Sequence, residues 1–472
     1  MKLDPTSHRG YRGLPTLAGL ATLEEAAKPG LAVEQSVARL KRFHYCLVRL
    51  HEILTARITA EPIYELKTAF SHHAYLCAEH VQALRNRVAE MREPPLGLEA
   101  VPHPGLRLAF DEILAADTTE SLLLGIYDVA LPMLDDAMSR HQHDTNPLTD
   151  APSNRVLRFA RLEIGDMIAF GKQAITCLVV ERPGDWLTHL ATCFASAGGV
   201  DGLASASSPT VPIRSSQPYV YDRVPRRDER WRDPWNQGVN AEAFLYDEAM
   251  PARAKALMML YKRLREIDVP EMMASIIHET KGKPWEYYVG MSRQLWDEAR
   301  HAMMGEVGFA ALGVDWTQAR ITLNWSHRLN TECTPLERHA VLYFIEQGLM
   351  TKTGKRYEWE VARESGIPLM ATIQDFDWAD EVLHAQIGRE WYVKDFSDLK
   401  QALEYGDRCW SKVLTKWRSD LDEGLTEHRN WWPELYQQAC ERWQVEPDPN
   451  ALAYDVTYES VRPDLKAISA SA

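Results

Sequence analysis

Two six-residue stretches share one pattern of acids and histidine. Residues 297–302 read DEARHA and residues 380–385 read DEVLHA, so Asp-Glu-x-x-His-Ala occurs twice. On an α-helix, residues three apart lie on one face, so the Glu and the His of each stretch can bind the same metal ion. A single Glu-x-x-His usually lies on a helix face exposed to solvent. Two copies with the same flanking residues favour a metal site instead. The sequence therefore predicts four ligands from these stretches: Glu298, His301, Glu381 and His384.

A centre for two metal ions inside a helical bundle also needs a carboxylate from each of two further helices. Glu266 lies 32 residues before Glu298, with the turn sequence KGKP between them, and Glu346 lies 35 residues before Glu381. Each pair is therefore joined by a helical hairpin of similar length. Because an α-helix rises 1.5 Å per residue, we expect the four acids to meet at one level of the bundle.

A weak internal repeat supports this choice of acids. RLHEI at 49–53 matches RLREI at 263–267, and AEHVQA at 78–83 matches DEARHA. Three of the four acid pairs share an offset of 218 or 219 residues, which is what a tandem duplication leaves behind. The aligned pairs are Glu52 with Glu266, Glu79 with Glu298, Asp128 with Glu346 and Glu163 with Glu381.

The alignment also decides between neighbouring acids in the second copy. Glu271 competes with Glu266 because Pro270 interrupts the helix nearby, and Glu337 competes with Glu346. The repeat favours Glu266 and Glu346 in the two cases.

The first copy keeps four acids but lacks both imidazoles of the second. Because redox sites for iron and manganese favour mixed imidazole and carboxylate ligands, we predict that this copy is a degenerate site. The alternative is that its acids form a structural network with nearby arginines: Arg85, Arg158 or Arg161.

Helical periodicity fills both halves of the chain and predicts an all-α protein. A stretch rich in Gly, Ser, Pro and Arg separates the halves and is typical of a linker. We predict two tandem four-helix bundles, with helices of the second at about 242–280, 284–312, 335–351 and 367–394. The predicted domains are a degenerate bundle at 1–195, the linker at 196–240, a bundle with a complete dimetal site at 241–394 and a helical tail at 395–472.

Composition excludes several classes of protein. The net charge of −14 over 472 residues argues against nucleic-acid binding, which needs clustered Lys and Arg. No stretch approaches the roughly 18 apolar residues of a membrane-spanning helix. The seven cysteines are odd in number and form no Cys-x-x-Cys pair, which indicates a reducing, cytoplasmic compartment.

With these residues in this order, the sequence resembles the ferritin-like di-iron carboxylate superfamily. The order Glu, Glu-x-x-His, Glu, Glu-x-x-His is complete in residues 242–394 and weakened in residues 40–180. The resemblance implies ferritin-like bundles and two Fe ions, with Mn or a mixed Fe/Mn pair as alternatives. It implies that Asp297 and Asp380 orient the ligand imidazoles. The implied ligands are Glu266, Glu298, His301, Glu346, Glu381 and His384.

A dimetal site of this kind suits oxidation by O₂. The leading expectation is an oxygenase or oxidase acting on a small-molecule substrate. The alternatives are a ferroxidase or iron-handling protein and a noncatalytic ferritin-like scaffold. Because no flavin or nicotinamide fingerprint is present, an electron-donor protein is an expected partner. A homodimer is the expected assembly if the chain associates with itself.

Overall fold

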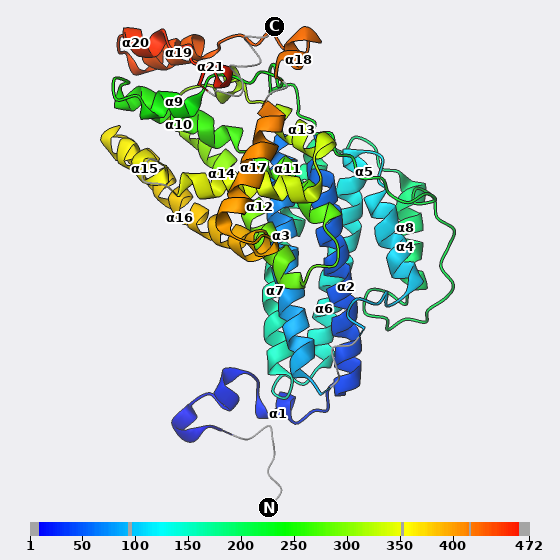
Figure 1. The fold of residues 1–472 in the computed structure, drawn as a ribbon. Coiled ribbons are helices and arrows are strands. Elements are labelled where there is room, and N and C mark those ends of the chain that lie inside the picture. The colour runs from blue at the N-terminus through cyan, green and yellow to red at the C-terminus, as the bar shows by residue number, and fades with distance from the viewer. Residues whose placement is uncertain (1–8, 93–96, 351–353, 415–416, 462–472) are drawn as a thin grey trace, which may run out of the picture. The chain divides into compact units, whose positions relative to one another are not determined.

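The computed structural model describes residues 9–92, 97–350, 354–414 and 417–461, and over these ranges it is helical (Figure 1). The one β-type contact in the described ranges is an isolated bridge between Val239 and Thr457. The prediction of an all-α protein is therefore confirmed. None of the described helices combines the length and the apolar character that crossing a membrane requires.

The chain divides into two compact units. The first consists of Met1–Leu54 and His73–Tyr221, and the second consists of Thr55–His72 and Asp222–Ala472. The division at Tyr221 lies within the stretch 196–240 that the sequence predicts as a linker. The end of α2 (Val33–Ile58), the start of α3 (Tyr64–Glu90) and the turn that joins them, residues 55–72, belong to the second unit.

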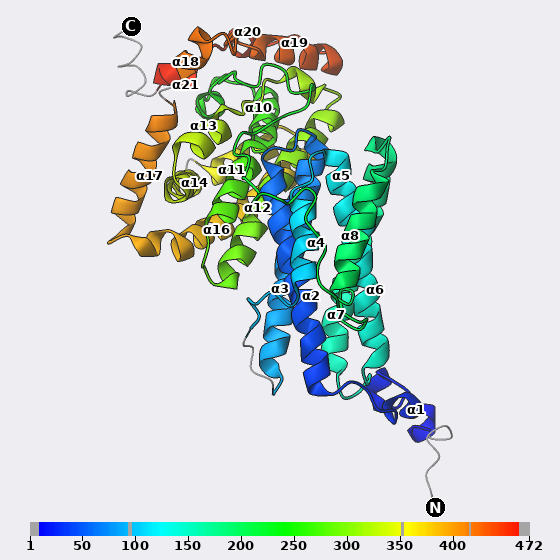
Figure 2. The ribbon, with the colours of Figure 1, turned by 90° about the vertical axis from the view of Figure 1, so that its right-hand side faces the viewer.

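In the first unit, the long helices α2, α3, α6 and α7 run alongside one another in both views of the ribbon (Figures 1 and 2). Helix α2 presents a fully buried row, Leu40, Phe43, Leu47, Leu50 and Leu54, at alternating steps of three and four residues. This spacing places one apolar stripe along the helix. The helices are α1 (Leu23–Ala26), α2 (Val33–Ile58), α3 (Tyr64–Glu90), α4 (Pro104–Leu114), α5 (Thr119–Leu123), the π-helical η3 (Leu124–Ala130), α6 (Leu131–Asp144), α7 (Ala151–Leu178) and α8 (Gly184–Ser196).

A buried carboxylate on α4 fixes the chain that follows α8. Glu112 is fully buried and accepts hydrogen bonds from the backbone N–H groups of Ile213 at 2.8 Å, Arg214 at 3.0 Å and Ser215 at 2.9 Å. The Ser215 hydroxyl donates at 2.7 Å and the Trp186 indole N–H at 3.2 Å. A single side chain thus satisfies five donors and holds residues 213–215 against the helices.

Replacing Glu112 by alanine is expected to destabilise the first unit by about 3 kcal/mol, because several buried donors lose an ionised acceptor. Burial acts to raise the Glu112 pKa, but the donated hydrogen bonds outweigh it and lower the pKa below 4.5. The stabilisation is therefore complete above pH 4.5 and is lost as the pH falls through the lower pKa of the folded state. Amide hydrogen exchange at 213–215 should accelerate in the variant, whereas Glu181→Ala, at an exposed position, should leave it unchanged.

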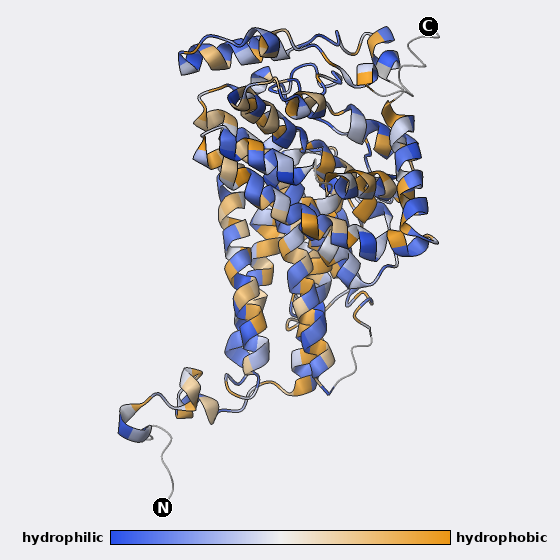
Figure 3. Ribbon diagram, turned by 60° about the vertical axis from the view of Figure 1, so that its left-hand side comes forward, coloured by the Kyte–Doolittle hydropathy of each residue, from blue (hydrophilic) through white to orange (hydrophobic). Residues whose placement is uncertain are grey.

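In the second unit, α12 packs against α10, α11 and α16, and α14 packs against α11, α16 and α17. Figure 3 shows hydrophobic and hydrophilic residues interspersed along the helices of the chain. The helices are α9 (Ala241–Tyr246), α10 (Ala252–Arg265), α11 (Asp268–Glu279), α12 (Trp285–Ala311), α13 (Asn324–Glu332), α14 (Pro335–Leu349), α15 (Lys355–Glu364), α16 (Pro368–Trp391), α17 (Leu399–Leu414), α18 (Trp417–Asp422), α19 (Trp432–Trp443), α20 (Pro449–Leu452) and α21 (Tyr458–Val461).

The C-terminal helices contribute to the core of the second unit. Trp432 and Leu435 of α19 are fully buried in one apolar cluster with Leu257 and Leu260 of α10. The Trp432 indole also donates a hydrogen bond to the carbonyl oxygen of Ala451 at 2.7 Å. The described part of the predicted tail at 395–472 therefore belongs to the same compact unit as the helices before it.

Candidate metal centre

The structure brings all six predicted ligands together in the second unit, in two adjoining groups. In each group, one ligand atom from every side chain lies within 4.8 Å of the others. Glu381 belongs to both groups, so the two groups share its carboxylate. The first group is Glu266, His301, Asp377 and Glu381, and the second is Glu298, Glu346, Glu381 and His384.

Four helical segments supply these side chains. Helix α12 carries Glu298 and His301, and their spacing of three residues places both on one face. Helix α16 repeats this arrangement, α14 adds one acid, and the junction of α10 and α11 adds another. Apart from Glu266, whose side chain is 13% exposed, the ligands are at least 95% buried.

A helix break positions Glu266. Pro270 cannot donate a backbone hydrogen bond, and its ring would clash with the carbonyl of Glu266 in a continuous helix. Helix α10 accordingly ends at Arg265, and α11 begins at Asp268. Backbone hydrogen bonds between residues three apart hold the junction, and in one of them the Val269 N–H donates to the Glu266 carbonyl oxygen at 3.0 Å. The interruption predicted around Pro270 is therefore a restart, and Glu266 lies at the corner.

Both Asp-Glu-x-x-His-Ala stretches continue to a glycine four residues after the histidine, Gly305 and Gly388. A Cβ atom on Gly305 would lie 2.5 Å from the backbone nitrogen of Leu264, and one on Gly388 would lie 2.2 Å from the Tyr343 ring. Any side chain at Gly305 would push α12 away from α10. The glycines let helices approach each other one turn from each histidine.

Each imidazole directs its Nδ1 atom at the carboxylates. His301 Nδ1 lies 3.4 Å from Glu266 Oε2 and 3.7 Å from Glu298 Oε2. His384 Nδ1 lies 3.1 Å from Glu298 Oε1 and 3.5 Å from Glu381 Oε2. The two ring centroids are 5.8 Å apart. The Nδ1 atoms are therefore the nitrogens that can ligate metal.

The other nitrogen of each imidazole meets an aspartate of the opposite motif. His301 Nε2 lies 3.2 Å from Asp380 Oδ2, and His384 Nε2 lies 3.4 Å from Asp297 Oδ2. Arg300 donates to both aspartates, at 2.5 Å and 2.6 Å. The two aspartates thus lie beside the imidazoles as the resemblance implies, but the pairing is crossed between the two motifs.

The donor atoms of the site fit metal ions. Buried polar atoms nearly always have a hydrogen-bond partner. Five buried atoms of the site have none that meets hydrogen-bond geometry, and mixed carboxylate and imidazole donors suit iron or manganese. These atoms are Glu266 Oε2, Glu298 Oε1, His301 Nδ1, Glu381 Oε2 and His384 Nδ1.

Three charged residues of the site were missed by the sequence reasoning. Asp377 lies one helical turn before Glu381, so the same helix-face argument could have found it. Lys355, fully buried, places its Nζ atom 2.9 Å from Asp377 Oδ1 and 2.8 Å from Glu381 Oε1. Arg263 forms ion pairs with Asp377 and, at 2.7 Å, with Glu266. No signal in the sequence relates these basic residues to the acids on α16.

Burial and neighbouring charges shift the pKa values of the site in different directions. Burial and repulsion by neighbouring carboxylates raise the pKa of Glu346 well above 4.5. Burial also acts to raise the Glu266 pKa, but Arg263, His301 and Lys355 together outweigh it and bring the pKa to about 2. For His301, burial favours the neutral ring, yet Asp380 and two glutamates raise the pKa to about 10. Because ligands bind metal without their protons, metal binding to the metal-free chain should release protons.

The acids that compete with the predicted ligands serve other purposes. Glu337 caps α14, where its carboxylate accepts from the Thr334 N–H at 2.7 Å. Glu271 forms buried ion pairs with Lys67 at 2.8 Å and Arg227 at 3.1 Å. Neither acid belongs to the two groups, in line with the preference for Glu266 and Glu346.

The four aligned acids of the first unit lie on four different helices, α2, α3, η3 and α7, but are much less buried. Glu79 and Asp128 are exposed, and the side chains of Glu52 and Glu163 are 33% and 40% exposed. Glu163 lies 2.7 Å from His80 Nε2. None of the four belongs to either metal-type group found among the described residues.

Three ion pairs of the first unit differ from those of the alternative structural network. Arg85 and Arg161, two arginines of that network, pair with Glu99 and Asp135, which are not among the four aligned acids. The aligned acid Asp128 pairs with Arg182, which is not an arginine of that network. One contact does follow the repeat: Arg49 pairs with Glu52 at 3.1 Å, as Arg263 pairs with Glu266.

Glu163→Ala is expected to leave the metal content of the protein unchanged, because this half-exposed acid is remote in sequence from both groups and interacts with His80. The measurement is metal per chain after reconstitution, with circular dichroism to check folding. A variant that folds but loses metal would mean that the first unit also carries a functional metal site.

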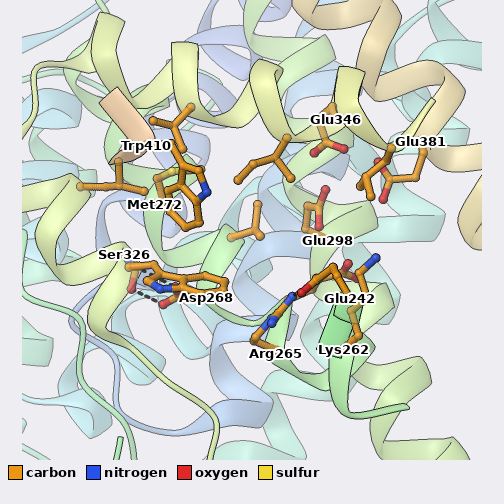
Figure 4. A pocket seen from close by; sticks show the side chains of 17 residues that line it. Glu242, Lys262, Arg265, Asp268, Met272, Glu298, Ser326, Glu346, Glu381 and Trp410 are labelled. Carbon is orange, nitrogen blue, oxygen red and sulfur yellow. Dashed lines mark hydrogen bonds and ion pairs between the residues drawn. The ribbon is translucent and has the colours of Figure 1, made fainter. Parts of the chain in front are cut away.

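A pocket with a volume of about 110 Å³ adjoins the metal centre. Figure 4 shows the carboxylates of Glu298, Glu346 and Glu381 gathered on one side of it, with Met272 and Trp410 on another. Its apolar wall also includes several aliphatic side chains and a second tryptophan: Val269, Leu329, Val341, Ile345, Leu349 and Trp325.

The charged side chains of the pocket outside the metal centre have polar partners. Arg265 donates to Glu242 at 2.9 Å, and Lys262 donates at 2.5 Å to Glu358, which does not line the pocket. Asp268 accepts from the Ser326 hydroxyl at 2.5 Å (Figure 4). The arrangement therefore suits a largely apolar molecule that has access to the carboxylates.

Comparison of the chain with protein-family models, with curated proteins and with solved structures finds no match.

Proposed function

We propose that this protein is a non-haem dimetal carboxylate oxygenase or oxidase that uses O₂ to oxidise a small, largely apolar molecule. The observation that carries the proposal is the convergence of two Glu-x-x-His pairs and further carboxylates into two buried groups that share Glu381. Five buried atoms of these groups have no partner that meets hydrogen-bond geometry, and burying them is costly unless a metal ion binds them. We take iron as the metal, with manganese as the alternative.

In this proposal, the helices of the second unit form a ferritin-like bundle, and the first unit is a degenerate copy of it. The order of the acids along the chain and the pairing of Arg49 with Glu52, as of Arg263 with Glu266, support the duplication. The six sequence-predicted ligands and Asp377 would hold the metal ions. An electron-donor protein would supply reductant.

The bound metal pair would supply O₂ activation, and the side chains would orient the ligands, hold the substrate and exclude water. Asp297 and Asp380 contact the Nε2 atoms of the two histidines and so fix the orientation of the imidazole rings. The apolar wall around Met272 and Trp410 would hold the substrate and exclude water from the carboxylates. The pocket supports this part of the proposal because four of the ligand acids line it, Glu266, Glu298, Glu346 and Glu381, the last three of them labelled in Figure 4.

Oxygen uptake during a titration with ferrous iron tests the function. We expect uptake by the metal-free protein to stop once two irons per chain have been added, and to resume with ascorbate and a neutral aromatic probe such as naphthalene. Mass spectrometry should find an oxygen atom from ¹⁸O₂ in the naphthalene product. Glu381→Ala serves as the control without metal.

Two results would contradict the proposal. Continued uptake well beyond two irons, with accumulation of ferric product, would identify iron oxidation as the function. A protein that binds no iron or manganese at all would favour the noncatalytic scaffold.

A further inference from the structure

Positive charge is distributed unequally over the two ligand groups. The carboxylates of the first group form close ion pairs with two buried basic side chains, Lys355 and Arg263. In the part of the chain that the structure describes, no lysine or arginine forms an ion pair with Glu298 or Glu346 of the second group. Their charged partners are the two histidines, and Gln294 donates to Glu346 at 3.1 Å.

The position of Lys355 is fixed by several contacts. Its Nζ atom lies 2.9 Å from each Asp377 oxygen and 2.8 Å from Glu381 Oε1, and its side chain is completely buried. Glu381 offers its other oxygen, Oε2, toward His384. The two oxygens of the shared carboxylate therefore face different neighbours, one an ammonium and the other the second group.

A divalent cation entering the first group must compete with these ion pairs. It would approach oxygens that Lys355 and Arg263 already contact, and it would be repelled by both positive charges in a medium with little water. Two unit charges a few ångströms apart inside a protein interact strongly enough to change an affinity by at least about tenfold. In the second group, Lys355 contacts only the shared Glu381, through Oε1, and Glu298 and Glu346 form no ion pair with a lysine or arginine among the described residues, so this competition is weaker there.

We infer that the two groups bind metal unequally: Glu298, Glu346, Glu381 and His384 form the tight site, and the group held by Lys355 and Arg263 fills second and more weakly. The inference rests on the proposed dimetal function and adds an order of loading to it. At limiting metal the chain would carry one ion, which leaves the weaker group open to a different divalent metal.

A titration of the metal-free full-length chain with Co²⁺ tests the inference, with binding followed by calorimetry and by the visible absorbance of the ion. The wild-type chain should bind one ion at least about tenfold more tightly than the second. Lys355→Met should tighten the second step by at least about tenfold and change the first step less. Arg356→Met removes a charge from the adjacent position, where the side chain is 64% exposed, and should change neither step.

A second measurement applies if Lys355→Met does not fold without metal, since Asp377 and Glu381 would lose a counter-charge. The variant is then purified with Co²⁺ and dialysed against a chelator at a concentration that leaves the wild-type chain with one ion. The variant should retain two. Equal affinities in the wild-type chain, or no tightening in Lys355→Met, would overturn the inference alone. A wild-type chain that binds no Co²⁺, Fe²⁺ or Mn²⁺ would overturn the proposed function together with it.

Discussion

Glu381→Ala is expected to abolish binding of both metal ions, because Glu381 is the one residue common to the two ligand groups. Its loss removes a ligand from each group at once, whereas every other single ligand belongs to one group. The fold should survive, since Lys355 keeps its ion pair with Asp377 at 2.9 Å. Metal per chain, measured by plasma mass spectrometry after reconstitution, should fall from two ions to background.

The control for this experiment is Glu390→Ala, which removes an exposed acid from the same helix, α16. It should retain both ions. If Glu381→Ala also retained both ions, the shared-carboxylate arrangement would be wrong.

His301→Ala and His384→Ala are each expected to weaken metal binding in one group by more than about 100-fold. Losing a residue that only orients a ligand weakens binding by up to about 100-fold, and each histidine is itself a proposed ligand. His301 belongs to the first group and His384 to the second, so each variant should retain a single ion, and the double variant should retain none. The Nδ1 atoms are the proposed ligands, so millimolar imidazole should restore the lost ion in part. Metal counts with and without imidazole provide the measurement.

The matched control for the histidine variants is His327→Ala, which removes an imidazole that packs on Trp235 in the same unit. Its metal content should equal that of the wild-type chain. Unchanged metal content in both His301→Ala and His384→Ala would refute the assignment of the site.

Much of the site could be predicted because its chemistry is local to helices. Spacing of three residues identifies Glu298 with His301, and Glu381 with His384, without knowledge of the fold. Pro270 predicts the interruption of the first helix for the same local reason, because its ring is incompatible with a continuous helix.

The features that the sequence did not reveal depend on tertiary packing. Lys355 approaches Asp377 only because α15 packs against α16, and no periodic pattern encodes that approach. The crossed pairing of the aspartates with the histidines has the same origin. Residues 55–72 also pack with the second unit, where Tyr64 joins the apolar cluster that contains Trp231.

The crossed pairing makes each half of the centre dependent on the other. His301 of one hairpin is oriented by Asp380 of the other, and His384 is oriented by Asp297 in return. A chain that has folded only one hairpin therefore has neither a complete ligand group nor a correctly held imidazole. Occupancy of the centre would consequently report that the whole unit has assembled, and a partly synthesised chain would be unable to hold a reactive metal ion.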